Sequence, residues 1–189
     1  MEQNHEIIDT NKDYEELLLK VGTTLEKGRS RVAAALKTIM VDTYWEIGRD
    51  IVEYEQDGHE KAEYGSEVLS RLSQDLTNRY GKGFSRSNVV YMRKLYNVYP
   101  NRQTLSDQLS FSHYVELLKI EDPMERSFYE KECASEGWGV RELKRQMKSM
   151  LFHRIALSSD KNEVMRLAQE GQIIESAEDI IKEPYVFEF

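Results

Sequence analysis

The stretch Gly81–Tyr96, GKGFSRSNVVYMRKLY, decides how we interpret the fold of this chain. Its two closely spaced glycines tolerate positive φ angles and therefore predict a tight turn. Ser85 is a good helix N-cap, and we expect a helix over residues 86–99, because Pro100 follows. Apolar residues at helical spacing predict another helix over residues 67–80. A helix, a glycine turn and a second helix together predict a helix-turn-helix.

This stretch belongs to a segment that contains no acidic residue. The whole chain has 34 acidic and 26 basic residues and a net charge of −8. Six basic residues and no Asp or Glu lie between Leu76 and Ser106: Arg79, Lys82, Arg86, Arg93, Lys94 and Arg102. Such a local reversal of charge indicates either a face for a polyanion or a contact with an acidic part of the same protein. An ordinary solvated helix face is the plainer alternative.

A helical projection at about 100° per residue gives the helix over residues 86–99 two sides. Val89, Met92 and Leu95 fall on an inner apolar side, and Arg86 and Lys94 fall on an outer basic side. We expect phosphate contacts from Arg79, Lys82, Arg86, Arg93 and Lys94. We expect base-edge contacts from Ser87, Val90 and Tyr91, next to the Ser85 cap. We expect secondary contacts from a basic side of a later helix: Arg141, Lys144, Arg145 and Lys148.

The composition predicts a mostly α-helical, multi-helix domain with a long N-terminal helical arm. Charged residues make up 32% of the chain, and only three prolines and ten glycines are present, which leaves little room for a loop-rich β architecture. We expect four regions: a disordered stretch 1–13, a helical arm 14–60, the helix-turn-helix region 61–106 and a second helical module 107–175. The arm is either one helix or two joined near Gly28. The second module should contain one continuous helix over residues 139–156.

Several classes of protein are excluded or disfavoured. No apolar run approaches 18 residues, so no membrane span is expected, and the single cysteine, Cys133, fits a cytoplasmic protein. The four histidines are isolated from one another and lack the spacing of metal ligands. Residues 142–144 match the ExK part of the PD-(D/E)xK nuclease motif, but that motif lies on strands and these residues fall in a predicted helix. We therefore expect no catalytic site and no cofactor in this chain.

Several blocks of the sequence together resemble a known family. They include TYWEIGRDIVEYEQ at residues 43–56, YGSEVLSRLSQDLTNRYGKGFSRSNVVYMRKLYNVYP at residues 64–100, and the closing EPYVFEF. Over residues 14–189 the chain resembles the N-terminal domain of the YhcG-like proteins, which was catalogued as a domain of unknown function. The resemblance implies a helical DNA-binding domain that precedes a PD-(D/E)xK nuclease domain. It also implies that Mg²⁺ belongs to that nuclease domain alone.

The resemblance also bears on the C-terminal end of the chain. The sequence stops about where YhcG-like proteins pass into the nuclease domain, so we expect residues 176–189 to be a linker toward a domain that this chain lacks. We expect the chain to be either a fragment or a stand-alone version. On this basis the catalytic carboxylates of the family lie outside it.

These observations predict a DNA-binding domain that targets a nuclease to duplex or branched DNA, acting as a homodimer. The alternative is an oligomerisation or adaptor module, in which the arm pairs between chains and the basic face docks an acidic protein surface. An adaptor would form a defined oligomer and show no salt-sensitive affinity for DNA.

Overall fold

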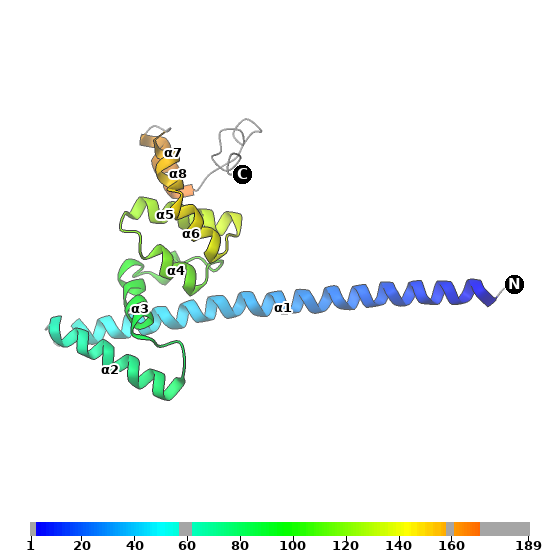
Figure 1. Cartoon of the computed structure of the whole chain (residues 1–189), viewed down its shortest axis with the longest axis horizontal. Helices are drawn as coiled ribbons and strands as arrows, with labels where there is room; N and C mark the ends of the chain where they lie inside the picture. Colours follow the sequence, from blue (N-terminus) through cyan, green and yellow to red (C-terminus); the bar gives the residue numbers. More distant parts are fainter. Residues whose placement is uncertain (1–2, 57–61, 158–160, 171–189) are drawn as a thin grey trace.

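The computed structural model describes residues 3–56, 62–157 and 161–170, and these residues form helices joined by short connections (Figure 1). The elements in chain order are α1 (Gln3–Gln56), α2 (Ala62–Tyr80), α3 (Arg86–Val98), a 3-10 turn η1 (Arg102–Thr104), α4 (Phe111–Leu117), α5 (Pro123–Glu136), α6 (Val140–Lys148), α7 (Leu151–Ala156) and α8 (Lys161–Glu170). No strand occurs in these three ranges. The expectation of a mostly α-helical, multi-helix domain is confirmed.

The first helix is longer than the sequence predicted. It runs without a break through Gly28, so the arm is one helix rather than two. It also begins at Gln3, whereas we expected residues 1–13 to be disordered. Once a helix is nucleated, each further residue adds one hydrogen bond, and the polar residues before Tyr14 include no proline that would stop this extension. In Figure 1 the N-terminal half of α1 projects far from the other helices.

The C-terminal half of α1 is the support on which α3 packs. A Cβ atom on Gly48 would lie only 2.1 Å from the backbone oxygen of Met92, so the two helices cross closely because Gly48 has no side chain. One turn earlier, the indole nitrogen of Trp45 donates a hydrogen bond to the carbonyl oxygen of Tyr99 at 2.6 Å. The Trp45 ring also meets the ring of Tyr96 edge-on. These contacts fix the position of α3 on α1.

The main core lies where α4, α5, α6 and α7 meet. Its largest fully buried side chains include Tyr114, Phe128, Tyr129, Leu143 and Leu151. A smaller apolar cluster of Ile51, Leu69 and Val89 joins α1, α2 and α3. Helix α8 packs on α5.

The expected single helix over residues 139–156 is wrong. The chain bends between α6 and α7 at Met150, which has a φ angle of 56° and is the one non-glycine residue with positive φ in the described ranges. The bend buries Leu151 and Phe152. It is fixed by Tyr129, whose hydroxyl donates to the carbonyl of Gln146 at 3.2 Å and accepts from the amide of Phe152 at 3.3 Å.

The expected ends of the other helices are close to those observed. Ser85 caps α3, as predicted, and Asp122 caps α5, which has Pro123 in its first turn. Helix α2 begins earlier than residue 67, and α3 ends at Val98. Residues 171–189, which include the expected linker, lie outside the described residues, so the domain boundaries stay predictions.

Candidate nucleic-acid interface

The turn between α2 and α3 is held by both helices. Gly81 and Gly83 have φ angles of 84° and 121°, which agrees with the prediction from their positions. The hydroxyl of Ser73 on α2 donates to the carbonyl of Phe84 at 2.7 Å, and the side-chain amide of Asn88 on α3 donates to the carbonyl of Gly83 at 2.8 Å. The hydroxyl of Ser85 accepts from the amide of Asn88. These bonds orient the start of α3 relative to α2.

The predicted site residues around this turn differ in exposure. The exposed ones are Arg79, Lys82, Ser85, Arg86, Ser87 and Lys94. Val90 and Tyr91, which we expected to reach base edges, are half-buried. Val90 packs against the small apolar cluster, and Tyr91 packs against the main core. Ser87 is the one exposed residue of these three.

Two of the six basic residues in the acid-free segment pair with acids of α1. Arg93 on α3 donates to the carboxylate of Glu55 at 2.8 Å, and both side chains are partly buried. Arg102 contacts the carboxylate of Asp42 and also that of Asp107, the latter at 3.1 Å. The absence of acids from the segment is therefore partly explained by contact with an acidic part of the same protein.

The other bases of the segment point into solvent. No ion pair joins Arg79, Lys82 or Lys94 to a carboxylate among the residues that the structure describes. The Nε atom of Arg86 donates to the hydroxyl of Ser70 at 2.9 Å, which orients an exposed guanidinium at the first turn of α3. No acid occupies that first turn, so the positive end of the helix dipole is not neutralised there.

The second predicted set, on α6, is more strongly paired with acids. All four residues are exposed: Arg141, Lys144, Arg145 and Lys148. Arg145 forms an ion pair with Glu142 at 2.8 Å, and its hydrogen bond lowers the pKa of that carboxyl. Lys144 lies 3.6 Å from Glu116. In Figure 1 helix α2 lies below α1 and helix α6 lies above it.

A half-buried polar group that was not predicted from the sequence lies between α3, α4 and α5. Glu130 accepts hydrogen bonds from the hydroxyls of Tyr99 at 2.8 Å and Tyr114 at 3.4 Å. Burial raises the pKa of Glu130, and the two hydrogen bonds act in the opposite direction. Both carboxylate oxygens have partners, so the group joins three helices. No sequence spacing identifies it, because its partners are 16 and 31 residues away.

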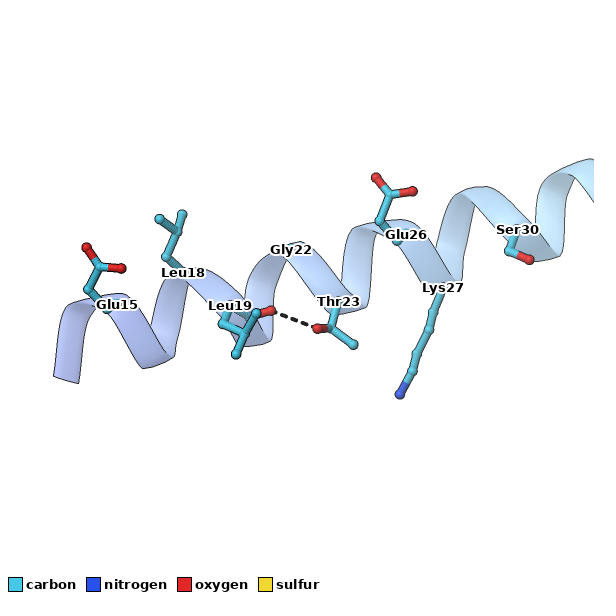
Figure 2. A pocket seen from close by; sticks show the side chains of 8 residues that line it. All are labelled: Glu15, Leu18, Leu19, Gly22, Thr23, Glu26, Lys27 and Ser30. Carbon is cyan, nitrogen blue, oxygen red and sulfur yellow. Dashed lines mark hydrogen bonds between the residues drawn. The ribbon is translucent and has the colours of Figure 1, made fainter. Parts of the chain in front are cut away.

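The hollow beside Gly22 is lined by one helix alone. Figure 2 shows its lining residues, which all belong to α1, on the turns before and after this glycine. The one hydrogen bond drawn there joins the hydroxyl of Thr23 to the carbonyl of Leu19 within the same helix. A hollow along one bare helix encloses no ligand and brings no reactive groups together.

Two further features concern metals and membranes. No group of three or more His, Cys, Asp or Glu residues is placed to hold a metal ion within the described ranges. No helix in those ranges is both long enough and apolar enough to cross a membrane.

The chain can be compared with known proteins over most of its length. The model of the DUF1016 N-terminal domain matches residues 20–154. The protein named "Putative nuclease YhcG" of Escherichia coli (strain K12) is 32% identical in an alignment 212 residues long, which spans 95% of this chain and 56% of that protein. The chain thus spans about half the length of the curated relative it matches. No solved structure matches it. The chain belongs to the DUF1016 N-terminal domain family, which is the YhcG-like family that its motifs resemble.

Proposed function

We propose that this chain binds duplex or branched DNA through the face formed by the end of α2, the glycine turn and the outer side of α3. The observation that supports the proposal is the group of exposed bases on an acid-free segment: Arg79, Lys82, Arg86 and Lys94. The whole chain has a net charge of −8, so a positive face of this kind is a local feature rather than a general one. We call these four residues the α3 basic face.

Binding would rest mainly on contacts with phosphates. Exposed Arg and Lys side chains release counterions from DNA when they meet phosphates, and this term does not depend on base sequence. The first turn of α3, which carries no acidic residue, adds backbone N–H groups and the positive end of a helix dipole beside Arg86. Ser87, exposed on the same turn, is the side chain with access to a base edge.

The salt dependence follows from the number of contacts. Arg93 is held by Glu55, so we count the four residues of the α3 basic face. Four phosphate contacts give a slope of about −3.6 for log K against log salt, which is a loss of about 100-fold in affinity between 50 and 200 mM salt. A shallower slope would indicate fewer contacts.

The test is fluorescence anisotropy of labelled duplex, branched and single-stranded DNA across a salt series. The double variant Arg86→Glu with Lys94→Glu should lose binding, because it reverses two of the four charges. A matched control, Lys12→Glu with Arg166→Glu, makes the same charge change at exposed positions far from the turn and should retain binding. Equal losses in both variants would overturn the assignment of the face. No binding to any DNA at low salt would overturn the proposed function.

The association with a nuclease comes from the family. The relative's name describes it as a nuclease, and this chain corresponds to about half of that protein. We propose that the chain is the targeting half of such an enzyme and works as a cytoplasmic homodimer. The described residues offer no set of ligands for the Mg²⁺ that a nuclease domain would need, so we assign no metal-dependent step to them.

One observation favours the alternative of an oligomerisation or adaptor module. The arm exposes a series of large apolar side chains, several of them more than half accessible to solvent. Contiguous exposed apolar surface indicates an interaction site. A role in assembly is compatible with DNA binding, because the two surfaces lie on different parts of the molecule.

A further inference from the structure

The N-terminal half of α1 carries a continuous apolar stripe. At about 100° per residue, every residue from 14 to 39 that falls within one arc of about 100° is apolar or glycine. We call this stripe the arm seam. It consists of Tyr14, Leu17, Leu18, Val21, Leu25, Gly28, Val32, Ala35, Leu36 and Ile39.

The arm seam is uncovered in the single chain. Its large side chains are between 47% exposed, at Val21, and 69% exposed, at Val32. Val41, two residues after the seam ends, is only 1% exposed. A long helix in water draws most of its stability from packing of an apolar face, so a partner is expected along the seam.

The seam does not extend the face that packs in the body of the protein. The residues of α1 that contact the rest of the fold, including Val41, Gly48 and Val52, lie about half a turn around the helix from the centre of the seam. On the seam's own side, the chain becomes polar after Ile39, with Glu46 following. A partner on the seam therefore lies opposite α3 and does not compete with it.

The spacing within the seam indicates that the partner is another helix. The central positions alternate in steps of four and three residues: Tyr14, Leu18, Val21, Leu25, Gly28, Val32, Ala35 and Ile39. This average of about 3.5 residues is the heptad repeat of a left-handed coiled coil. The seam is about 38 Å long at the rise of an α-helix.

We propose that the occupant is a second copy of this chain, whose arm packs antiparallel to the first and forms a two-fold dimer. The inference deepens the homodimer prediction and does not depend on DNA binding. In this arrangement Leu25 lies opposite Gly28 of the second copy, and Leu18 lies opposite Ala35. Val21 meets Val32, which completes a series of layers in which each small residue faces a large one.

A parallel pair in register would pack less well. It would place Gly28 against Gly28 and Ala35 against Ala35, and layers of two small residues leave cavities. It would also place Leu25 against Leu25, so that two large side chains share one layer. Two arms therefore pack better when they run antiparallel than when they run parallel in register.

The distribution of charge favours the same order. The N-terminal end of the arm is acidic, with Asp13, Glu15 and Glu16, whereas its second half is basic, with Lys27, Arg29, Arg31 and Lys37. Antiparallel packing places the acidic end of one arm beside the basic half of the other. Parallel packing aligns like charges, which repel. An isologous two-fold interface requires one patch that is complementary to the same patch on a second copy.

The first experiment measures the mass in solution by light scattering over a range of protein concentrations. We expect twice the 22.2 kDa of the chain for the wild type and a single-chain mass for Leu25→Lys. Leu19→Lys is the matched control, because Leu19 is an exposed leucine of the same helix that lies outside the seam. A monomeric wild type, or a Leu25→Lys variant that remains dimeric, would overturn the proposal.

The second experiment tests the antiparallel order with engineered cysteines. A mixture of the Val21→Cys and Val32→Cys variants should form a disulfide between the two variants under mild oxidation, and neither variant alone should link to itself. The native Cys133 does not interfere, because it is buried and its pKa is raised to about 12 by that burial. Efficient self-linking of each variant, or no linking in the mixture, would contradict the antiparallel order.

The two proposals fail separately. Anisotropy with DNA reports on the α3 basic face, and mass reports on the arm seam. A dimeric protein without affinity for DNA would refute the first proposal alone. A monomer that binds DNA with a steep salt dependence would refute the second alone.

Discussion

The two halves of α1 belong to one uninterrupted helix, but they are used differently. After residue 40, apolar side chains such as Val41 and Ile51 are buried, and the acids Asp42 and Glu55 pair with arginines from other parts of the chain. Before residue 40 the apolar side chains are exposed. The contrast shows that helical periodicity defines an apolar face, whereas tertiary structure decides whether that face is covered. Matched changes in the two halves, or in the residues that pair with them, should therefore differ in their effects.

The largest difference is expected for removal of a leucine side chain. Leu95 on α3 is fully buried against α1, so Leu95→Ala should lower the free energy of unfolding by about 4 kcal/mol. Leu19→Ala in the arm removes the same atoms from a side chain that is 71% exposed and lies outside the arm seam, and it should change the stability of the protein by less than about 0.5 kcal/mol. Chemical denaturation of both variants provides the comparison. Similar losses would mean that the arm packs on the body.

The next largest difference in stability is expected between alanine substitutions at two glycines of α1. Gly48→Ala should cost about 3 kcal/mol, because the new Cβ meets the backbone of α3 and the helices must separate. Gly22→Ala meets no atom within 4 Å and should raise stability by up to about 1 kcal/mol through helix propensity. Thermal or chemical unfolding measures both changes. A neutral Gly48→Ala would show that α3 does not need the close crossing.

A third comparison concerns the ion pair between α1 and α3. Glu55→Gln should cost about 1 kcal/mol of stability or less, because the pair with Arg93 is only partly buried. The variant also releases Arg93 from its acidic partner. We therefore expect tighter binding of DNA, with the salt slope steeper by about 0.9 for one added phosphate contact.

The control for that ion pair lies in the arm. Glu26→Gln breaks the exposed pair with Arg29 and should leave both stability and DNA affinity unchanged. If Glu55→Gln weakens binding of DNA instead, the pair positions α3 for binding rather than restraining Arg93.

The smallest effect is a dependence of stability on pH. His113 is buried in α4, where its Nδ1 atom accepts from the amide of Ser110 and its Nε2 atom donates to the carbonyl of Trp138. Burial lowers the pKa of His113, so the folded state favours the neutral ring. Its contribution is present above the unfolded pKa of about 6.5 and is lost as the pH falls through the lower folded value.

The comparison with His113→Asn isolates this contribution from those of other groups. The difference in unfolding free energy between the wild type and the variant should shrink between pH 7.5 and pH 5. It should not change if the imidazole has the same pKa in the folded and unfolded states. Denaturation at several pH values measures it.

Features set by neighbouring residues could be predicted from the sequence. The Ser85 cap, the positive φ angles of Gly81 and Gly83, and the start of α5 at Pro123 depend on residues a few positions away. The bend at Met150 could not be predicted, because it follows from burial of Leu151 and Phe152 against distant helices. The amphipathic pattern continues unchanged through the bend, so nothing in the neighbouring sequence indicates that the helix ends there.

The candidate site shows the same division. The exposed bases of the α3 basic face were identified from charge and periodicity alone. The pairing of Arg93 and Arg102 was not predicted, because their partners on α1 are 38 and 60 residues away in the chain. The half-buried state of Tyr91 was missed for a similar reason, since the core that it contacts comes from other helices. Charge patterns indicate a face, and only the fold shows which of its charges remain available.

The length of the arm has a consequence for the spacing of DNA sites. In the proposed antiparallel dimer, the two Gly48 crossings, and with them the two α3 helices, lie about 65 Å apart along the shared axis. Two turns of duplex DNA span about 68–72 Å. The length of the arm would then set the distance between the two basic faces at close to two turns of the DNA duplex. Insertion of one heptad in the arm should lengthen the preferred spacing between paired sites.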